Sequence, residues 1–419
     1  MTAENKQKPL DNMRKLMEIL GDPQDDLKFI HIAGTNGKGS TACMTANILT
    51  KAGYKTGLFT SPYLQKFNER IRIDGKCIPD CELSEVMALV KEKAEETGNS
   101  YSEFEEVTAA GFLYFKKMHC DIVVLEAGIG GLRDATNIIK TTLVSVITAI
   151  GLDHTEKLGN TLEEIAFQKS GIIKKNVSTV AADQDESILS VIRKRCLEEN
   201  SNLTVTEGKK AIFSAISKEG QVFTLPSHGN FEISLLGKNQ AENASCAIEA
   251  VKLLRLKGFI VSDEDIREGL KNTLWAGRFE IIGKAPYFVL DCGHNVNCME
   301  SLKENIEKYF PNKKPVILTG IMKDKDFKDT YDILDESASA YVAVAVDYER
   351  AMSPHALAEF LRSYNKPVFS YPTIREGIDK AVSYAKEKGT FVLAAGSVYV
   401  CGDIRTILTG EDEVPVMKK

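Results

Sequence analysis

Near its N-terminus the chain reads Phe29-Ile30-His31-Ile32-Ala33-Gly34-Thr35-Asn36-Gly37-Lys38-Gly39-Ser40-Thr41. The first five residues form an apolar strand, and residues 42–52 then place small and apolar side chains on one face of a predicted helix. Between strand and helix, glycines let the backbone curl so that successive N–H groups point inward, at the positive end of the helix dipole. Together with the charge of Lys38, this pattern predicts a phosphate-binding loop in which Ser40 or Thr41 reaches a magnesium ion.

This loop departs from the common nucleotide-binding pattern, which has glycine six positions before the lysine and Ser or Thr directly after it. Ile32 and Gly39 occupy those two positions. For the loop taken alone, a glycine-rich turn with a solvated lysine is the structural alternative. The rest of the sequence favours the phosphate-binding interpretation.

The composition is that of an ordinary globular enzyme. At 419 residues the chain exceeds what a single hydrophobic core usually supports, so two domains are expected. A net charge of -6 without long basic runs argues against a nucleic-acid or an anionic-membrane surface. The nine cysteines form no C-x-x-C pair, and no apolar run approaches membrane-spanning length. We therefore expect reduced thiols, a cytoplasmic location and no membrane anchor.

Apolar runs alternate with helical stretches in both halves of the chain. Such alternation predicts an α/β fold with a mainly parallel sheet in the first half and a smaller, doubly wound unit in the second. Gly283 and Pro286 interrupt the pattern, which places the boundary between Glu280 and Pro286 and gives domains 1–283 and 284–419. The predicted strands are 29–33, 56–60, 121–125 and 143–150, then 287–291, 315–319, 341–346, 367–370 and 390–394.

Polar residues follow the predicted strands of the first half. Ser61 comes after the second strand, Glu126 after the third and His154 after the fourth. Because ligands of an open parallel sheet bind beyond the carboxyl ends of its strands, these positions matter most for function. We expect Ser40, Ser61, Glu126 and His154 to converge beside a bound triphosphate.

Glu126 is the strongest candidate for a metal ligand. It follows four apolar residues, where an unpartnered charge would be costly, so a cation is a physical reason for its position. Magnesium takes one or two carboxylates in proteins, and phosphate oxygens complete its shell. A carboxylate that caps the next helix is the alternative for Glu126, and a hydrogen-bonded structural role is the alternative for His154.

Three other charged residues have ordinary structural interpretations. Lys169 lies in the last turn of a helix that begins with the capping-box pair Thr161 and Glu164, so its charge offsets the helix dipole. Arg278 and Asp291 flank the proposed domain junction. Pockets favour such junctions, although surface salt bridges explain the same charges.

With these residues in place, the chain resembles the folylpolyglutamate synthase and dihydrofolate synthase group of the Mur ligase superfamily along nearly its whole length. Each matching motif is short, but their order along the chain is specific to the group. The motifs are His31–Ser40, Thr60–Pro62, Phe67–Ile71, Phe104-Glu105 with Thr108, Leu125-Glu126, Asp134–Asn137, Asp153-His154 with Leu158-Gly159, Lys169, Gln240 with Asn243-Ala244, Gly277–Glu280, Asp291 with His294-Asn295, Asp324-Lys325-Asp326 and Gly396-Ser397.

The resemblance implies a P-loop ATPase domain of Mur ligase type followed by a smaller Rossmann-like domain, with ATP and Mg²⁺ as cofactors. Lys169 matches the family's carbamylated lysine, a modification that turns a cation into a carboxylate-like group. The implied catalytic residues are Lys38, Lys169 and His294. The implied binding residues are, for ATP, Gly34, Thr35, Asn36, Gly37, Lys38, Gly39, Ser40, Asn243, Arg278 and Asp291; for Mg²⁺, Ser40, Ser61, Glu126, His154 and Lys169; for the pterin substrate, Glu105, Asp134 and Ala135; and for the incoming glutamate, His294 and Ser397.

The implied reaction is ATP-dependent amide formation, in which the substrate carboxylate attacks the γ-phosphate and the amine of L-glutamate then displaces phosphate. Such phosphoryl transfer needs in-line positioning and charge neutralisation more than a protein nucleophile, and Lys38 with magnesium meets that need. A reduced folate is the expected substrate, dihydropteroate a second one, and a monomer the expected state. The competing hypotheses are a ligase for another carboxylate, such as a cell-wall precursor, and a nucleotide-binding protein without ligase activity.

The chain departs from the family's usual strings in three places. In Gly130-Gly131-Leu132-Arg133-Asp134 the arginine stands one position late, and Asp291-Cys292-Gly293-His294-Asn295-Val296 replaces the usual Asp-Gly-Ala-His-Asn-Pro. Ser170 stands where alanine is frequent. The first two loops are therefore where this chain is expected to differ from its relatives.

Overall fold

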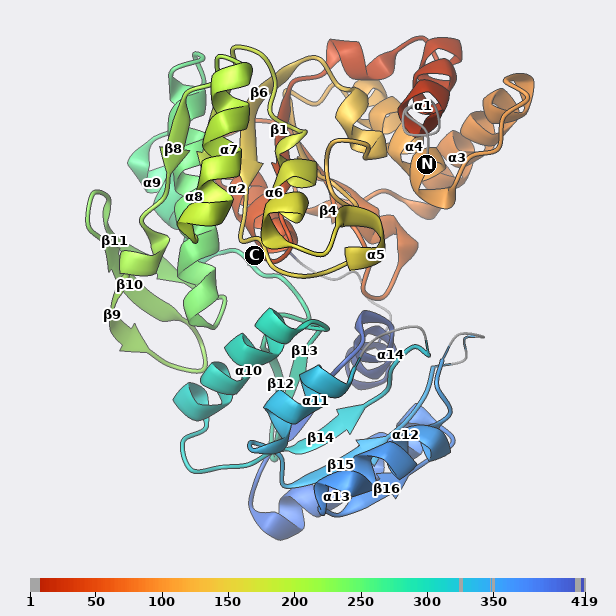
Figure 1. Ribbon diagram of the computed structural model, residues 1–419, viewed down its shortest axis with the longest axis vertical. Coiled ribbons are helices and arrows are strands. Elements are labelled where there is room, and N and C mark those ends of the chain that lie inside the picture. The colour runs from red at the N-terminus through yellow and green to blue at the C-terminus, as the bar shows by residue number, and fades with distance from the viewer. Residues whose placement is uncertain (1–7, 324–326, 347, 349–350, 411–415, 418–419) are drawn as a thin grey trace.

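Two α/β units lie one above the other in the computed structural model, which describes residues 8–323, 327–346, 348, 351–410 and 416–417 (Figure 1). The first unit is built on an eight-stranded sheet with the order β4-β3-β2-β5-β1-β6-β7-β8. The second is built on a six-stranded sheet with the order β12-β13-β17-β14-β15-β16. The predicted α/β class and the mainly parallel sheets are confirmed.

In the first sheet, all neighbours from β2 to β8 run parallel, and β3 and β4 add an antiparallel edge. The central strand β1 is buried at every position: Phe29 packs into the core on one face, while Ile30 and Ile32 pack into the core on the other. A strand buried on both faces explains its continuous apolar run. The strands are β1 Phe29–Ala33, β2 Thr56–Phe59, β3 Ile71–Ile73, β4 Lys76–Cys77, β5 Ile122–Glu126, β6 Thr142–Ile147, β7 Ser178–Ala181 and β8 Leu203–Val205.

Helices cover both faces of this sheet. One core cluster joins it to α2, α8 and α9, and another joins it to α1, α3 and α4. A smaller cluster at the strand ends involves α6 and α7. The helices are α1 Lys8–Ile19, α2 Lys38–Lys51, α3 Asp80–Glu96, α4 Glu103–Lys117, α5 Thr155–Leu158, α6 Leu162–Ser170, α7 Glu186–Glu198, α8 Lys238–Arg255 and α9 Asp263–Lys271.

The second unit is doubly wound, as predicted. One core cluster contains residues of α10, α11 and α12, and the other contains residues of α13 and α14. Its strands are β12 Glu280–Lys284, β13 Tyr287–Asp291, β14 Val316–Thr319, β15 Ala340–Ala343, β16 Val368–Ser370 and β17 Val392–Ala395. Its helices are α10 Val296–Tyr309, α11 Lys328–Asp335, α12 Pro354–Leu361, α13 Ile374–Lys388 and α14 Val398–Thr409.

The predicted boundary between Glu280 and Pro286 needs correction. Strand β12 pairs antiparallel with β13, so residues 280–284 already belong to the second sheet, and Gly283 and Pro286 lie in a hairpin rather than in a linker. By its sheet pairing the second unit therefore begins at Glu280. Local turn residues mark a hairpin and a domain linker in the same way, which is why the sequence pattern misplaced the boundary.

Two further features complete the fold. Strands β9 Ile212–Ile216, β10 Gln221–Leu225 and β11 Gly229–Ile233 form a separate antiparallel sheet, which packs against the core of the first unit. Among the residues that the structure describes, no helix has the length and apolar character needed to cross a membrane. The motif Asp324-Lys325-Asp326 lies outside the described residues.

Candidate active site

The candidate site lies where four neighbouring parallel strands end. β2, β5, β1 and β6 are adjacent in that order, and Ile32 of β1 is in register with Glu126 of β5. The loops that follow these strands therefore leave the sheet at the same edge. Glu126 is the last residue of β5, and the phosphate loop, Ser61 and His154 lie in the segments after β1, β2 and β6, so these positions stand at one edge. Their shared role in binding stays a prediction.

The phosphate loop connects β1 to α2 and depends on two glycines. A Cβ atom at Gly34 would lie 1.8 Å from Oγ1 of Thr148, so no larger residue fits between the loop and the end of β6. Gly37 has φ +86°, and its Cβ would lie 2.1 Å from Oδ1 of Asn243. This close approach brings Asn243, a predicted ATP-binding residue on α8, against the loop.

Lys38 and Glu126 meet at the centre of the site. Nζ of Lys38 lies 4.0 Å from Oε1 of Glu126 and donates a hydrogen bond to the carbonyl oxygen of Thr35 at 3.2 Å. The backbone N–H of Ser61 donates to Oε2 of Glu126 at 3.2 Å. Burial raises the pKa of Glu126, while Lys38 and the Ser61 N–H act against that rise. The carboxylate is thus buried beside the phosphate loop, where a cation stabilises its charged form.

Ser40 and His154 lie at the same edge. Ser40 is buried in the first turn of α2, and His154 is the N-cap residue that precedes α5, with its Nε2 3.9 Å from Oδ1 of Asp153. One carboxylate with two hydroxyl groups suits a magnesium ion that takes its other ligands from phosphate and water. Among the described residues there is no cluster of three or more His, Cys, Asp or Glu side chains arranged to hold a metal ion on their own.

Lys169 is buried behind the phosphate loop. Its Nζ donates to the carbonyl oxygen of Gly34 at 2.6 Å, which places the last turn of α6 against the start of the loop. Burial and, second to it, the nearby charge of Lys38 lower the pKa of Lys169 to about 7, against the opposing influence of Asp153 and Asp134. A lysine that merely offset the helix dipole would remain in water, so the position of Lys169 favours a role in the site.

Asp291 of the second unit and Arg278, which lies just before that unit, are also at this edge. Asp291 accepts hydrogen bonds from the backbone N–H groups of Phe279 at 3.0 Å and Gly293 at 2.8 Å. Burial raises the pKa of Asp291, and Arg278 acts to lower it. For Arg278, burial acts to lower the pKa, but nearby groups that include Asp291 and Glu126 raise it overall. Arg278 therefore interacts electrostatically with Glu126 of the first unit and with Asp291 of the second.

A polar contact joins the phosphate loop to the start of α10. Nδ2 of Asn295 donates to Oδ1 of Asn36 at 3.0 Å and to Oδ2 of Asp153 at 3.2 Å. Nε2 of His294 lies 3.8 Å from the same Asp153 carboxylate, and its Nδ1 lies 3.2 Å from the carbonyl oxygen of Cys292. His294 therefore faces the first unit, at the edge that carries the phosphate loop.

The predicted pterin residues make contacts within their own loops and helix. Asp134 is buried, and its carboxylate accepts hydrogen bonds from the N–H and hydroxyl groups of Thr136 and from the N–H of Ile129 at 2.9 Å. Ala135 is buried beside it. Glu105 caps its own helix by accepting hydrogen bonds from the N–H and hydroxyl groups of Ser102. These contacts organise the loops, and binding by these residues stays a prediction.

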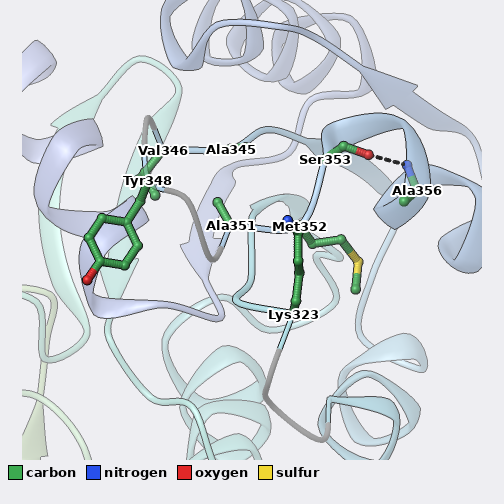
Figure 2. Close-up of a pocket in the computed structure, with 8 residues that line it drawn as sticks. All are labelled: Lys323, Ala345, Val346, Tyr348, Ala351, Met352, Ser353 and Ala356. Atoms are coloured by element: carbon green, nitrogen blue, oxygen red, sulfur yellow. Dashed lines mark hydrogen bonds between the residues drawn. The ribbon is translucent and has the colours of Figure 1, made fainter.

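Ser397 precedes α14 at the carboxyl end of β17 in the second unit, where it is buried. A cavity of about 550 Å³ lies at the same edge of that sheet (Figure 2). The ring of Tyr348 in its lining stacks on Tyr399, two residues after Ser397. The lining consists of Lys323, Ala345, Val346, Tyr348, Ala351, Met352, Ser353 and Ala356.

Sequence reasoning missed several residues that shape the site. Trp275 packs against Gly39, so that a Cβ there would lie 3.1 Å from the indole ring. Arg70, within the motif Phe67–Ile71, lies over the rings of Tyr63 and Phe67, and its guanidinium group is 3.7 Å from the carboxylate of Glu103. No spacing rule predicts such contacts between distant segments. The motif Asn68-Glu69-Arg70 was the available signal for Arg70.

Two family models match the chain: "Mur ligase middle domain" over residues 32–251 and "Mur ligase, glutamate ligase domain" over residues 277–398. The dihydrofolate synthase/folylpolyglutamate synthase of Bacillus subtilis (strain 168) is 34% identical over 407 residues, which cover 94% of each protein. Folylpolyglutamate synthase of Mycobacterium tuberculosis complexed with ADP and AMPPCP has a TM-score of 0.88 at 29% identity, with coverage of 97% of this chain and 96% of that one. FolC of Escherichia coli in complex with DHPP and ADP has a TM-score of 0.82 at 28% identity, with coverage of 95% and 92%.

Proposed function

The chain belongs to the Mur ligase family, in the group of folylpolyglutamate and dihydrofolate synthases, and on this premise we propose that it joins L-glutamate to a reduced folate with ATP. The observation that carries the proposal is the meeting of Lys38 and Glu126 at 4.0 Å beside the phosphate loop. Arg278, just before the second unit, and His294 within that unit support it, because both face the same edge. Dihydropteroate is a second proposed substrate, in line with the names of the relatives.

In this mechanism the substrate carboxylate attacks the γ-phosphate of ATP and releases ADP, which gives an acyl phosphate. The amine of L-glutamate then attacks the acyl carbon, loses a proton and displaces phosphate. Lys38 and the N–H groups of the phosphate loop stabilise the charge that spreads over the transferred phosphoryl group. The second unit excludes water from the acyl phosphate while it lies against the loop.

Magnesium would be held by Ser40, Ser61 and Glu126, with His154 at the same edge. A bound Mg²⁺ would neutralise the phosphate oxygens and orient them for in-line transfer. The buried carboxylate of Glu126 fits a divalent cation, because burial alone raises the pKa of this carboxyl group and a bound cation lowers it again.

We also propose that Lys169 is carbamylated. Carbamate formation joins the neutral amine to CO₂ with loss of one proton, and a pKa of about 7 makes the neutral amine abundant at physiological pH. The resulting carboxylate-like group would add an oxygen donor behind the phosphate loop. The negative charge would also pair with Lys38, which at present acts to lower the pKa of Lys169.

The two organic substrates would approach from opposite sides. The folate is proposed to lie along Asp134, Ala135 and Glu105 in the first unit, and the glutamate to enter past Ser397 and His294 in the second. The cavity of Figure 2 supports this entry side, because it lies at the edge of the sheet that carries Ser397. The enzyme is proposed to act as a cytoplasmic monomer.

A substrate panel tests the proposal. ADP release is measured with L-glutamate and with tetrahydrofolate, dihydropteroate or a muramyl precursor, and products are identified by mass spectrometry. The expected result is a folate or pteroate product heavier by one glutamyl residue. Turnover with the muramyl precursor alone would identify a cell-wall ligase, and nucleotide binding without any glutamylated product would remove the ligase function.

A further inference from the structure

The loop of residues 61–66 connects the two units at the active site. It begins with Ser61, two residues beyond the end of β2, and its middle reaches α14 of the second unit. Leu64 packs against the core cluster that contains residues of β13 and α14. One short segment therefore touches the carboxylate of Glu126 at one end and the second unit at the other.

The loop is fixed internally by the carboxylate of Glu69. Three consecutive N–H groups, from Leu64 at 2.8 Å, Gln65 at 3.0 Å and Lys66 at 3.0 Å, donate to it. Glu69 is buried, and Arg72 lies 3.8 Å from it. Charge-assisted hydrogen bonds of this kind are strong, so this half of the loop moves as one piece.

The contact with α14 depends on the absence of a side chain at position 402. A Cβ atom at Gly402 would lie 1.9 Å from the carbonyl oxygen of Leu64. This glycine lies inside α14, where alanine is the better helix former. The helix therefore retains glycine at the point where the loop backbone rests on it.

The neighbouring residue Gln65 is held by its side chain. Its Nε2 donates to Oγ1 of Thr406 at 2.9 Å, and its Oε1 accepts a hydrogen bond from Nη1 of Arg405. Arg405 also donates two bonds to Oε1 of Glu280 at 3.0 and 3.1 Å, and Glu280 accepts a bond from the N–H of Gly277 at 2.9 Å. The network thus links the loop to α14 and to the segment that joins the two units.

We propose that Gly402 and Arg405 are positioning residues that hold Ser61 against Glu126 through the loop 61–66. The proposal rests on the proposed function only for the role of Glu126 as a metal ligand. Because the loop is tied to both units, the second unit must be docked for Ser61 to stay in place. The hydroxyl of Ser61 is then available to magnesium only in the closed molecule, which couples phosphoryl transfer to the exclusion of water.

Gly402→Ala is the first test. Alanine favours the helix but clashes with the Leu64 carbonyl, so the loop must leave α14 while α14 stays folded. Hydrogen–deuterium exchange of the substrate-free protein should show peptides that cover residues 61–66 exchanging at least tenfold faster, with peptides of α14 unchanged. Asp403→Ala, an exposed neighbour on the same helix, is the control and should match the wild type.

Gln65→Ala is the second variant, because it removes the side-chain bonds from the loop and leaves Arg405 paired with Glu280. It should also speed exchange at residues 61–66. In both variants a higher Mg²⁺ concentration, by about tenfold, should be needed for half-maximal turnover, while KM for glutamate stays unchanged. Wild-type exchange at residues 61–66 in both variants would overturn the proposal. Fast exchange together with no ligase activity in the wild type would refute only the proposed function.

Discussion

At the scale of single residues, the pairing of Lys38 with Glu126 gives the sharpest expectation. Lys38→Ala removes the positive charge that faces the transferred phosphoryl group. Loss of one such electrostatic contact typically lowers kcat by about a hundredfold or more. The fold should persist, because the Lys38 side chain is partly exposed and its hydrogen bond goes to a loop carbonyl. Steady-state kinetics and the Tm measure the two effects.

Lys51, exposed at the other end of α2, provides the matched control. Lys51→Ala removes the same charge from the same helix and should keep wild-type turnover. A Lys38→Ala enzyme with wild-type kcat would show that this lysine is only a solvated residue of a glycine-rich turn, which is the structural alternative that the sequence left open.

Lys169 should carry a pH-dependent carbamate. Its pKa is lowered to about 7, so the amine is neutral above that pH and protonated below it, and only the neutral form reacts with CO₂. With ¹³C-labelled bicarbonate, a carbamate signal is expected in ¹³C NMR at about pH 8 and should fade toward about pH 6, as the protonated fraction rises. Lys169→Met should abolish the signal.

Lys174 is the control for this experiment, because it is half-buried and its pKa is lowered to about 8, chiefly by desolvation. It donates to the carbonyl oxygen of Asn137 at 2.9 Å, away from the phosphate loop. Lys174→Met should leave the carbamate signal intact. A signal that survives Lys169→Met but not Lys174→Met would place the carbamate on Lys174. That result would contradict the proposed role of Lys169.

The positions of the site residues could be predicted from the sequence only as far as the order of the strands could be predicted. Once β2, β5, β1 and β6 are neighbours, the positions of Ser61, Glu126 and the phosphate loop follow from where each strand ends. The environment of Lys169 did not follow, because the last turn of a helix faces water or protein according to tertiary packing alone. The bond from Lys169 to Gly34 therefore needed the structure.

At the scale of elements, the start of α6 controls the position of Lys169. Thr161 caps this helix. Its hydroxyl oxygen accepts a hydrogen bond from the N–H of Glu164 at 3.2 Å, and the carboxylate of Glu164 accepts one from the N–H of Thr161. Thr161→Ala should lower the free energy of unfolding by about 1 kcal/mol, the usual effect of losing such a cap. Urea denaturation measures this loss, and kcat should fall because Lys169 lies in the last turn of the same helix.

Ser262 provides a matched cap outside the site. It forms a capping box with Asp265 at the start of α9. Ser262→Ala should lower stability by a similar amount and leave kcat unchanged. Equal effects of the two substitutions on kcat would mean that α6 influences turnover only through global stability.

Most elements of the two sheets were predictable because each carries its own apolar period and turn residues. The capping box of α6 and the strand β13 are examples in which local sequence and structure agree. The strand β12 was not predictable in the same way, since its residues become a strand by pairing with β13 after a hairpin at Ala285 and Pro286. The sheet β9–β11 likewise depends on packing among three strands.

At the scale of the whole molecule, the last described residues return to the first unit. The carbonyl oxygen of Val416 accepts bonds from the N–H of Leu274 at 2.8 Å and from Nδ2 of Asn47 at 2.5 Å, on α2. Val416 is 1% exposed. No local feature of the sequence indicates that this segment docks on the first unit.

Truncation after Gly410 should therefore destabilise the first unit. Removal of Val416 exposes apolar surface and leaves buried Asn47 without that acceptor, so the free energy of unfolding should fall by roughly 2–4 kcal/mol. Thermal and urea unfolding measure the change. Removing only residues 418–419 is the control, and equal stability of both truncated forms would show that the docking of Val416 contributes nothing.

The contact between Asn36 and Asn295 joins residues 259 positions apart, and it tests what closure of the two units does. Asn295→Asp keeps an oxygen that caps α10 through the N–H of Cys298, but it loses the Nδ2 donor and puts a carboxylate beside Asp153. The start of α10 should then be repelled from the phosphate loop. Water would reach the acyl phosphate, so the ratio of phosphate released to glutamylated product should rise several-fold above one while nucleotide still binds.

Parallel measurement of phosphate and product tests this prediction. Asn295→Ser, which keeps the cap without the charge, is the control and should show a smaller rise. A ratio of one in the aspartate variant would mean that the acyl phosphate is shielded by groups other than this contact.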